Sequence, residues 1–262
     1  GAKVVKSVSG YDVPKLMVGA LGTLGVLGEL TLRLHPAPEF EAGWLAGFGD
    51  AAAAQAFVTR LLDSPVQPSR VEWLNAAALA VCGVAGMGAA VAVSIGTAES
   101  AVRAQGETLR AFARDAGGTV TPLADGFWAG YGKAMAPDDG VRLAVGTLAS
   151  KLAETAGEIA QAIGDECAGA RPTITACAAL GSLRAWCPET DPRRVGAVVE
   201  RLRQFVAPVG GSVVIRKAPA AVRAAVDPWG PIEAGPLALM RRLKDEFDPK
   251  RVLNPGRFVG GL

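Results

Sequence analysis

The residues best suited to binding chemistry are regularly spaced glycines near the start of the chain. Gly19, Gly22 and Gly25 alternate with small or apolar residues. No acidic residue occurs between Asp12 and Glu29. Glycines allow a backbone to approach a pyrophosphate closely, and successive N–H groups can bind an anion. Since the same spacing is also expected where a helix packs closely on a strand, a phosphate loop and a packing motif remain alternatives.

Other catalytic signatures are weak. The single histidine, His35, precedes a proline at a predicted strand end, which disfavours a Ser-His-Asp triad or a multi-histidine metal site. The chain has no Walker loop, and no G-x-G-x-x-G opens a helix. Its four cysteines lack C-x-x-C spacing, so we expect no metal site and a reducing, cytoplasmic setting. Cys177 and Cys187 are expected as buried thiols, with contact across a hairpin as the alternative.

Composition excludes several classes of protein. The chain has 262 residues, of which 50% are hydrophobic and 20% charged, so it is not a disordered polypeptide. A net charge of +2 and 6% aromatic residues disfavour nucleic-acid binding. The uncharged stretch between Glu72 and Glu99 is rich in alanine and interrupted by glycines. It predicts a buried helix or strand, a turn and a strand rather than a transmembrane segment.

Periodicity in the middle of the chain predicts an α+β fold. Between Gly43 and Lys217 the order β-α-β-β-α-β occurs twice, and each copy has the order of a ferredoxin-like unit, with an antiparallel sheet and helices on one face. Strands are predicted at 44–48, 70–74, 89–95, 119–122, 141–147, 173–178, 182–186 and 212–216, and helices at 50–63, 99–116, 150–163 and 192–206.

Shorter elements are predicted on both sides of this region. Residues 1–6 and 29–34 are predicted strands, the second because Leu30, Leu32 and Leu34 alternate with polar residues. Helical segments are expected at 11–18, 220–226 and 236–247.

Both ends of the chain resemble the vanillyl-alcohol-oxidase/PCMH flavoprotein superfamily. Residues 3–26, which include Gly10-Tyr-Asp and Gly22-Thr-Leu-Gly-Val, are similar to the second part of its FAD-binding domain. Asp227-Pro-Trp-Gly-Pro, Lys244-Asp-Glu-Phe-Asp-Pro and Leu253-Asn-Pro-Gly-Arg-Phe are similar to its C-terminus. Within the superfamily, the motifs most resemble the E-type, FAD-binding subunits of bacterial glycolate oxidase. The middle of the chain agrees only in its order of elements.

The resemblance implies a partial PCMH-type FAD-binding domain in residues 1–38 and 219–262 and a cap domain in 39–218. It implies that FAD is bound at its adenosine diphosphate by Gly22, Thr23, Gly25 and Val26, near its ribityl chain and flavin ring by Gly10, Tyr11 and Asp12, and at the flavin by Asn254 and Arg257. The local alternatives are a helix cap at Asp12 and an ordinary turn at Asn254.

The implied activity is oxidation of glycolate or a similar 2-hydroxy acid, with hydride passing to flavin and electrons to an iron–sulfur subunit. A sister flavoprotein subunit is a further implied partner, and the complex would be cytoplasmic, or peripheral to the inner membrane through its partners. Two departures weaken this interpretation. The family's first FAD subdomain is missing before Gly1, and the histidine- and acid-rich motif of D-type subunits is absent. A structural subunit, or a fragment that does not bind FAD by itself, is the alternative.

A 2-hydroxy acid would require a cation for its carboxylate. Arg142, Arg184 and Arg216 lie on predicted strands, and Arg184 shares a face with Trp186. We therefore take Arg184 as the residue expected to bind the substrate; the alternative is that it lies on a solvated face of the sheet.

Overall fold

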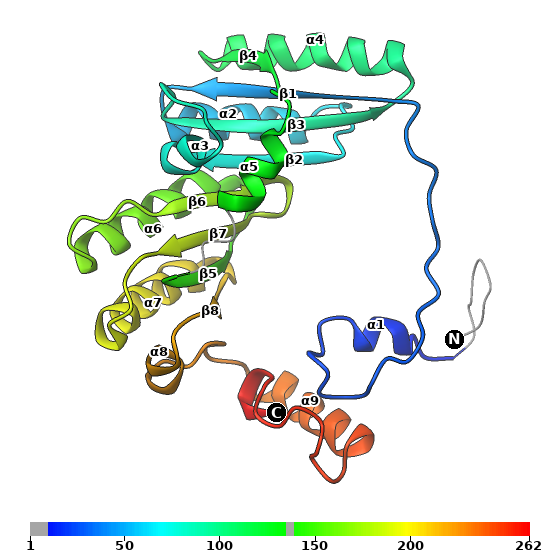
Figure 1. Cartoon of the computed structure of the whole chain (residues 1–262), viewed down its shortest axis with the longest axis vertical. Coiled ribbons are helices and arrows are strands. Elements are labelled where there is room, and N and C mark those ends of the chain that lie inside the picture. The colour runs from blue at the N-terminus through cyan, green and yellow to red at the C-terminus, as the bar shows by residue number, and fades with distance from the viewer. Residues whose placement is uncertain (1–9, 135–138) are drawn as a thin grey trace. The chain divides into compact units, whose positions relative to one another are not determined.

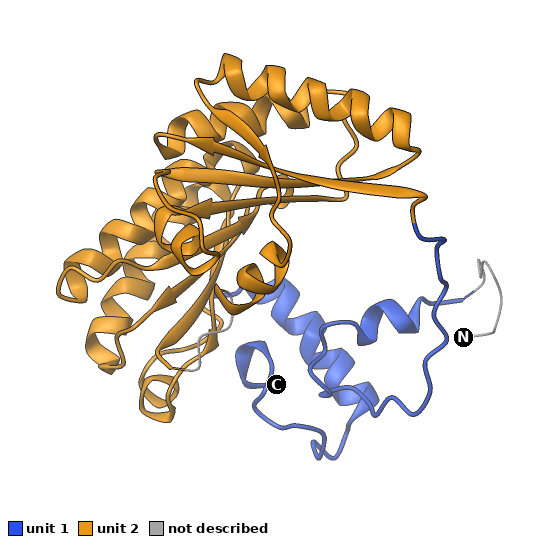
Figure 2. Cartoon of the chain, turned by 45° about the horizontal axis from the view of Figure 1, so that its top comes forward, with its two compact units in different colours: residues 1–37, 231–262 blue, residues 38–230 orange. Residues whose placement is uncertain are grey.

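The computed structural model describes residues 10–134 and 139–262, so the predicted strand at 1–6 lies outside the described residues. The chain divides into two compact units (Figure 2). Unit 1 comprises residues 1–37 and 231–262, and unit 2 comprises residues 38–230. The assignment of 1–38 and 219–262 to an FAD-binding domain, and of 39–218 to a cap, stays a prediction.

Unit 2 is built on one antiparallel sheet (Figure 1). Its eight strands, counted among the described residues, have the order β4-β1-β3-β2-β6-β7-β5-β8. They are β1 Phe40–Phe48, β2 Arg70–Asn75, β3 Ala89–Thr97, β4 Thr119–Pro122, β5 Val141–Gly146, β6 Thr173–Cys177, β7 Ser182–Cys187 and β8 Ser212–Lys217.

The sheet joins two ferredoxin-like halves. The strands of each half follow the ferredoxin order, in which the first and third strands lie at the centre. The halves meet where β2 pairs with β6, through Glu72–Cys177, Trp73–Ala176 and Leu74–Thr175. This topology confirms the predicted α+β class and its two ferredoxin-like units.

One face of the sheet carries the large hydrophobic core. Four helices pack there: α2 Ala51–Leu62, α4 Glu99–Asp115, α6 Leu152–Glu166 and α7 Pro192–Val206. Their starts follow from local chemistry, as α7 illustrates. Asp191 accepts hydrogen bonds from the N–H groups of Arg193 and Arg194, and Pro192 occupies the first helical position. Val195, Val199 and Leu202 then point into the core.

Two helices cover the opposite face of the first half, and the sequence analysis did not predict the second of them. They are α3 Ala76–Val81 and α5 Phe127–Ala134, and they enclose a smaller core around Leu74, Leu79 and Phe127. Between Glu72 and Glu99 the sequence predicts a helix or strand, a turn and a strand, and α3 and β3 show that the first element is a helix. Within the described ranges, no helix combines the length and apolar composition needed to cross a bilayer.

Unit 1 contains α1 Val13–Met17 and α9 Ala234–Phe247, while α8 Ala220–Ala225 belongs to unit 2. Short 3-10 turns lie at Ala149–Lys151, Ala178–Leu180, Ala207–Val209 and Val259–Gly261.

The predicted strand at 29–34 is wrong. Leu30, Leu32 and Leu34 are 68%, 74% and 85% exposed, and the segment pairs with no strand of the described chain. An alternating pattern makes a strand only where a neighbouring strand and an apolar layer meet it.

A buried ion pair holds the two parts of unit 1 together. Lys244 on α9 donates to Asp248 Oδ2 at 2.6 Å, to the Thr23 carbonyl at 2.7 Å and to the Leu253 carbonyl at 2.8 Å. Asp248 also accepts hydrogen bonds from the N–H groups of Val252 and Leu253. Both charged side chains are only 3% exposed. An ammonium group has three donors, and all three are used here; the bond to Thr23 connects residues 221 positions apart.

Asn75 holds the junction between the two halves of the sheet. Its Oδ1 accepts hydrogen bonds from Ala78 N at 2.9 Å, which caps α3, and from Ile174 N at 3.0 Å. Its Nδ2 donates to the Pro172 carbonyl at 2.8 Å. One side chain therefore satisfies backbone groups from both halves.

We expect Asn75→Ala to lower the free energy of unfolding by about 2 kcal/mol or more, because it removes a cap and leaves part-buried backbone groups unsatisfied. The control is Asp50→Ala, which removes the exposed cap of α2 and should cost about 1 kcal/mol. Urea denaturation followed by tryptophan fluorescence measures both. An Asn75→Ala loss no larger than that of the control would contradict the role of Asn75 at the junction.

Lys244→Met should loosen unit 1, because it leaves the Asp248 carboxylate buried without a cation and two carbonyls without their donor. Amide exchange in residues 12–25 and 250–258, measured by mass spectrometry, is expected to accelerate. Lys250→Met, at an exposed position, is the control and should leave exchange unchanged. The double variant Lys244→Met/Asp248→Asn should recover part of the protection. Unchanged exchange in Lys244→Met would show that the pair does not hold the loop.

The pH dependence of amide protection provides a second test of the Lys244–Asp248 pair. The hydrogen bond from Lys244, aided by those from Leu253 and Val252, lowers the pKa of Asp248 to about 2. A depressed folded pKa stabilises the fold above the unfolded pKa of about 3.9, and this contribution is lost as the pH falls toward the folded value. Protection of residues 12–25 should therefore decline between about pH 4 and pH 2, and Asp248→Asn should remove that step.

Candidate functional site

The glycine loop and the C-terminal turn lie in direct contact within unit 1. Asn254 Nδ2 donates to the Leu21 carbonyl at 2.7 Å. Gly22 has a φ of +73°, and a Cβ at this position would lie 2.8 Å from Asn254 Nδ2. Thr23 is buried, and its hydroxyl donates to the Ala20 carbonyl at 2.7 Å. The structure thus brings Gly22, Thr23 and Asn254 together, as a shared site requires.

The loop presents backbone donors. Among the described residues, the N–H groups of Gly22, Leu24, Gly25 and Val26 have no hydrogen-bond partner. The side chain of Val26 is 85% exposed, so this part of the loop is accessible. Open N–H groups in a glycine-containing loop can bind an anionic group. Thr23, in contrast, uses its hydroxyl and carbonyl to hold the loop in place.

The remaining predicted cofactor residues are exposed. Tyr11 is 98% exposed, and Gly10 has a φ of +83° with open space around it. Asp12 Oδ1 accepts from Lys15 N at 3.0 Å, so its carboxylate caps α1, as the local alternative had it. Arg257 is exposed in the C-terminal turn. Their roles toward FAD stay predictions.

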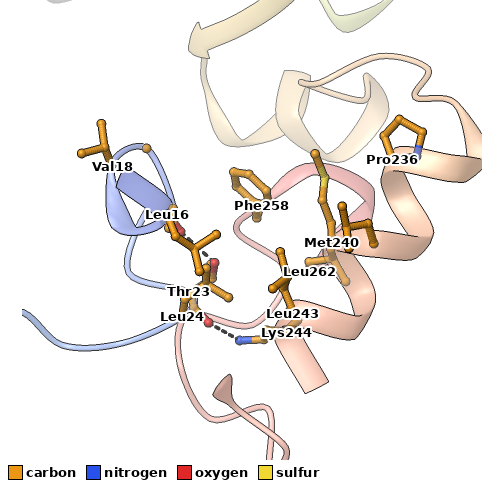
Figure 3. A pocket seen from close by; sticks show the side chains of 13 residues that line it. Leu16, Val18, Thr23, Leu24, Pro236, Met240, Leu243, Lys244, Phe258 and Leu262 are labelled. Carbon is orange, nitrogen blue, oxygen red and sulfur yellow. Dashed lines mark hydrogen bonds between the residues drawn. The ribbon is translucent and has the colours of Figure 1, made fainter. Parts of the chain in front are cut away.

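An apolar cavity of about 300 Å³ lies between the loop and α9 (Figure 3). Lys244 lies at its edge and reaches the Thr23 carbonyl (Figure 3). The lining residues are Leu16, Val18, Gly19, Ala20, Thr23, Leu24, Pro236, Leu239, Met240, Leu243, Lys244, Phe258 and Leu262. The sequence analysis did not identify Lys244 and Asp248 as site-forming residues, although Lys244 lies in the last turn of the predicted helix and Asp248, four residues later, directly follows that helix.

Unit 2 contains a second, polar cavity of about 470 Å³, which we call the arginine cavity. Its three arginines lie on the sheet face opposite the large core, because Arg142, Arg184 and Arg216 alternate with core residues along β5, β7 and β8. Arg142 Nε is buried and has no hydrogen-bond partner within the described ranges. The lining residues are Ala134, Arg142, Leu143, Ala144, Thr173, Ser182, Arg184, Ala185, Trp186 and Arg216.

A tyrosine on α5 lies beside Arg184 on the same face. The Tyr131 hydroxyl donates to Glu72 Oε2 at 2.5 Å. Burial, together with the bond to Glu72, raises the pKa of Tyr131, while Thr175 and Arg184 act in the opposite direction. Tyr131 therefore remains a protonated hydrogen-bond donor, and the Glu72 carboxylate accepts its hydrogen bond on this face of the sheet.

The cysteines and His35 form no catalytic group. Cys177 lies opposite Ser182, so the alternative contact between Cys177 and Cys187 is wrong. Cys187 instead lies with its Sγ 3.6 Å from that of buried Cys167. His35 is exposed and contacts Arg33. Among residues 10–134 and 139–262, no three His, Cys, Asp or Glu side chains gather in a way that could hold a metal ion.

Comparison with known sequences identifies the C-terminal part of the chain. Residues 187–258 match the model of the FAD linked oxidases, C-terminal domain. "Glycolate oxidase subunit GlcD" of Bacillus subtilis is 36% identical over 81 residues, which are 31% of this chain and 17% of that protein. "D-lactate dehydrogenase [cytochrome], mitochondrial" of Arabidopsis thaliana is 39% identical over 70 residues, or 27% and 12% of the two chains. "Glycolate oxidase subunit GlcE" of Escherichia coli is 50% identical over 38 residues, or 14% and 11%.

Solved structures extend the likeness of the fold over most of the chain. An alkyldihydroxyacetonephosphate synthase superposes with a TM-score of 0.61 at 13% identity, over 97% of this chain and 52% of that one. The 4-ethylphenol oxidase from Gulosibacter chungangensis superposes with a TM-score of 0.60 at 15% identity, over 86% and 55%. The chain thus spans about half the length of these proteins, and at such identities the likeness establishes the fold alone.

The family match includes the motifs near the C-terminus, and the sequence relatives and the shared fold point to the same group of flavoproteins. They confirm the resemblance of the C-terminal part of the chain to the FAD linked oxidases, and glycolate oxidase subunits and a D-lactate dehydrogenase are among the proteins that the chain resembles.

Proposed function

We propose that the chain is an FAD-binding subunit of an oxidoreductase that acts on glycolate or a similar 2-hydroxy acid. One observation carries the proposal. The segment that matches the FAD linked oxidases ends at Phe258, and it includes Asn254, whose amide contacts the glycine loop. The relatives named as glycolate oxidase and D-lactate dehydrogenase support a 2-hydroxy acid as substrate.

The loop residues fit an adenosine diphosphate. Open N–H groups at Gly22, Gly25 and Val26 provide donors for phosphate oxygens, and no acidic side chain lies between Asp12 and Glu29 to repel them. Asn254 and Arg257 in the adjoining turn would add polar and cationic contacts. When bound, FAD would supply an acceptor for the hydride that oxidation of a 2-hydroxy acid releases.

In this proposal the arginine cavity holds the substrate. Arg184 would pair with the carboxylate, since a planar guanidinium donates two parallel hydrogen bonds to a carboxylate. Electrons would pass to an iron–sulfur subunit in a complex that also contains a sister flavoprotein subunit, and this complex would be cytoplasmic or peripheral to the inner membrane through its partners. The presence of both GlcD and GlcE proteins among the relatives supports a complex of several subunits.

A structural or interaction subunit that does not bind FAD by itself is the second candidate. The exposure of Tyr11 and Val26 favours it, because the described part of unit 1 leaves these side chains uncovered.

The assembly that contains this chain should be yellow, and anaerobic addition of glycolate or D-lactate should bleach its flavin absorbance. Gly22→Val should reduce its flavin content, because a β-branched residue is strained at a φ of +73° and crowds Asn254. Gly28→Val is the control, since Gly28 has open space and an ordinary φ. An assembly with normal flavin content in both variants would argue for the structural alternative.

Arg184→Ala should raise the KM for the 2-hydroxy acid by at least about tenfold, because a charge-assisted pair with a carboxylate contributes roughly 1.5–3 kcal/mol. Steady-state kinetics of the assembly measures this effect. Arg193→Ala on the outer side of α7 is the control and should leave the KM unchanged. If the KM is also unchanged in Arg184→Ala, Arg184 does not bind the substrate.

A further inference from the structure

We propose that the arginine cavity binds a small dicarboxylate, so that the preferred substrate is a 2-hydroxy acid with a second carboxylate. The inference rests on the proposed function for the type of reaction. The negative charge expected of the ligand is inferred from the residues that line the cavity.

The cavity has more positive charge than one carboxylate can balance. Arg142, Arg184 and Arg216 line it, and among the described residues that line it none is acidic. Within residues 10–134 and 139–262, none of these three arginines forms an ion pair. A carboxylate takes two hydrogen bonds from one guanidinium, while neighbouring guanidinium groups repel one another. A ligand with two carboxylates removes more of that repulsion than a ligand with one.

The arginines also stand on three neighbouring strands. Arg184 lies on β7, Arg142 on β5 and Arg216 on β8, and β5 pairs with both of the other strands. The residue opposite Arg184 on β5 is Ala144, whose small side chain leaves room between the arginines. Strand spacing of about 4.8 Å separates the backbones of β7 and β8 by roughly 10 Å. Side chains that converge from these strands can reach both ends of a diacid with four or five carbons.

One buried donor lacks an acceptor. Arg142 Nε is buried, and the described chain provides no partner for it. A buried donor without an acceptor is costly, so an oxygen of the ligand is the expected partner. The hydroxyls of Thr173 and Ser182 add neutral hydrogen-bonding groups for the substrate hydroxyl. Trp186 already donates to the Asp139 carbonyl at 2.9 Å, so its ring serves as an apolar wall.

Isothermal titration calorimetry of this chain at low salt tests the proposal with malate and 2-hydroxyglutarate against lactate and glycolate. The dicarboxylates should bind at least about tenfold more tightly, as expected for one additional charge-assisted pair. Arg142→Gln and Arg216→Gln should each remove most of that preference and change lactate binding little, whereas Arg184→Gln should weaken all four ligands. Arg193→Gln is the control and should leave every affinity unchanged.

Equal affinity for mono- and dicarboxylates would overturn the proposal. Sulfate or phosphate binding as tight as that of malate would also overturn it, since the cavity would then be an unselective anion site. Arg216 is exposed, so Arg216→Gln decides the question even if Arg142→Gln does not fold. Because calorimetry requires no flavin, selective binding of dicarboxylates without flavin reduction in the assembly would refute the proposed function and leave this inference standing.

Discussion

The organisation of unit 1 depends on one buried ammonium group. Lys244 satisfies its three donors with a carboxylate and two carbonyls, and these acceptors come from the glycine loop, from α9 and from the C-terminal turn. A buried charge is tolerated only where it is paired and fully hydrogen-bonded, so these segments must assemble together. Asn254 then adds a second link from the turn to the loop. Residues near the two ends of the chain thereby become neighbours.

The fold of unit 2 depends on a different constraint, because its sheet must bury one face in a hydrophobic core. The two ferredoxin-like halves share one large core and join through three residue pairs between β2 and β6. The opposite face is covered by α3 and α5 in the first half, whereas the second half carries arginines there. A face that is free of core packing can hold polar side chains on a rigid support, which is the arrangement that binding sites require.

The comparisons and the structure support different parts of the functional argument. The family match lies at the C-terminal end and reaches from β7 to the turn that contacts the glycine loop. The fold likeness covers most of the chain but at 13–15% identity, so it cannot assign residue roles. The proposed roles of the loop and the arginine cavity therefore come from open N–H groups, charge and burial in this chain itself.

Local patterns in the sequence determined the strands of unit 2 and its helices α2, α4, α6 and α7, because alternation and helical periodicity mark the side chains that face the large core. The Asp191-Pro192 start of α7 and the strand at Thr119–Pro122 needed no tertiary information. The resemblance to flavoproteins also pointed to Gly22 and Asn254, which the structure brings into contact. Only the tertiary structure decided that 29–34 lacks a strand partner in the described chain, that Asn75 joins the two halves, and that Lys244 lies under the glycine loop. These features depend on residues far apart in the chain, and local periodicity does not predict which distant backbone groups a side chain will contact.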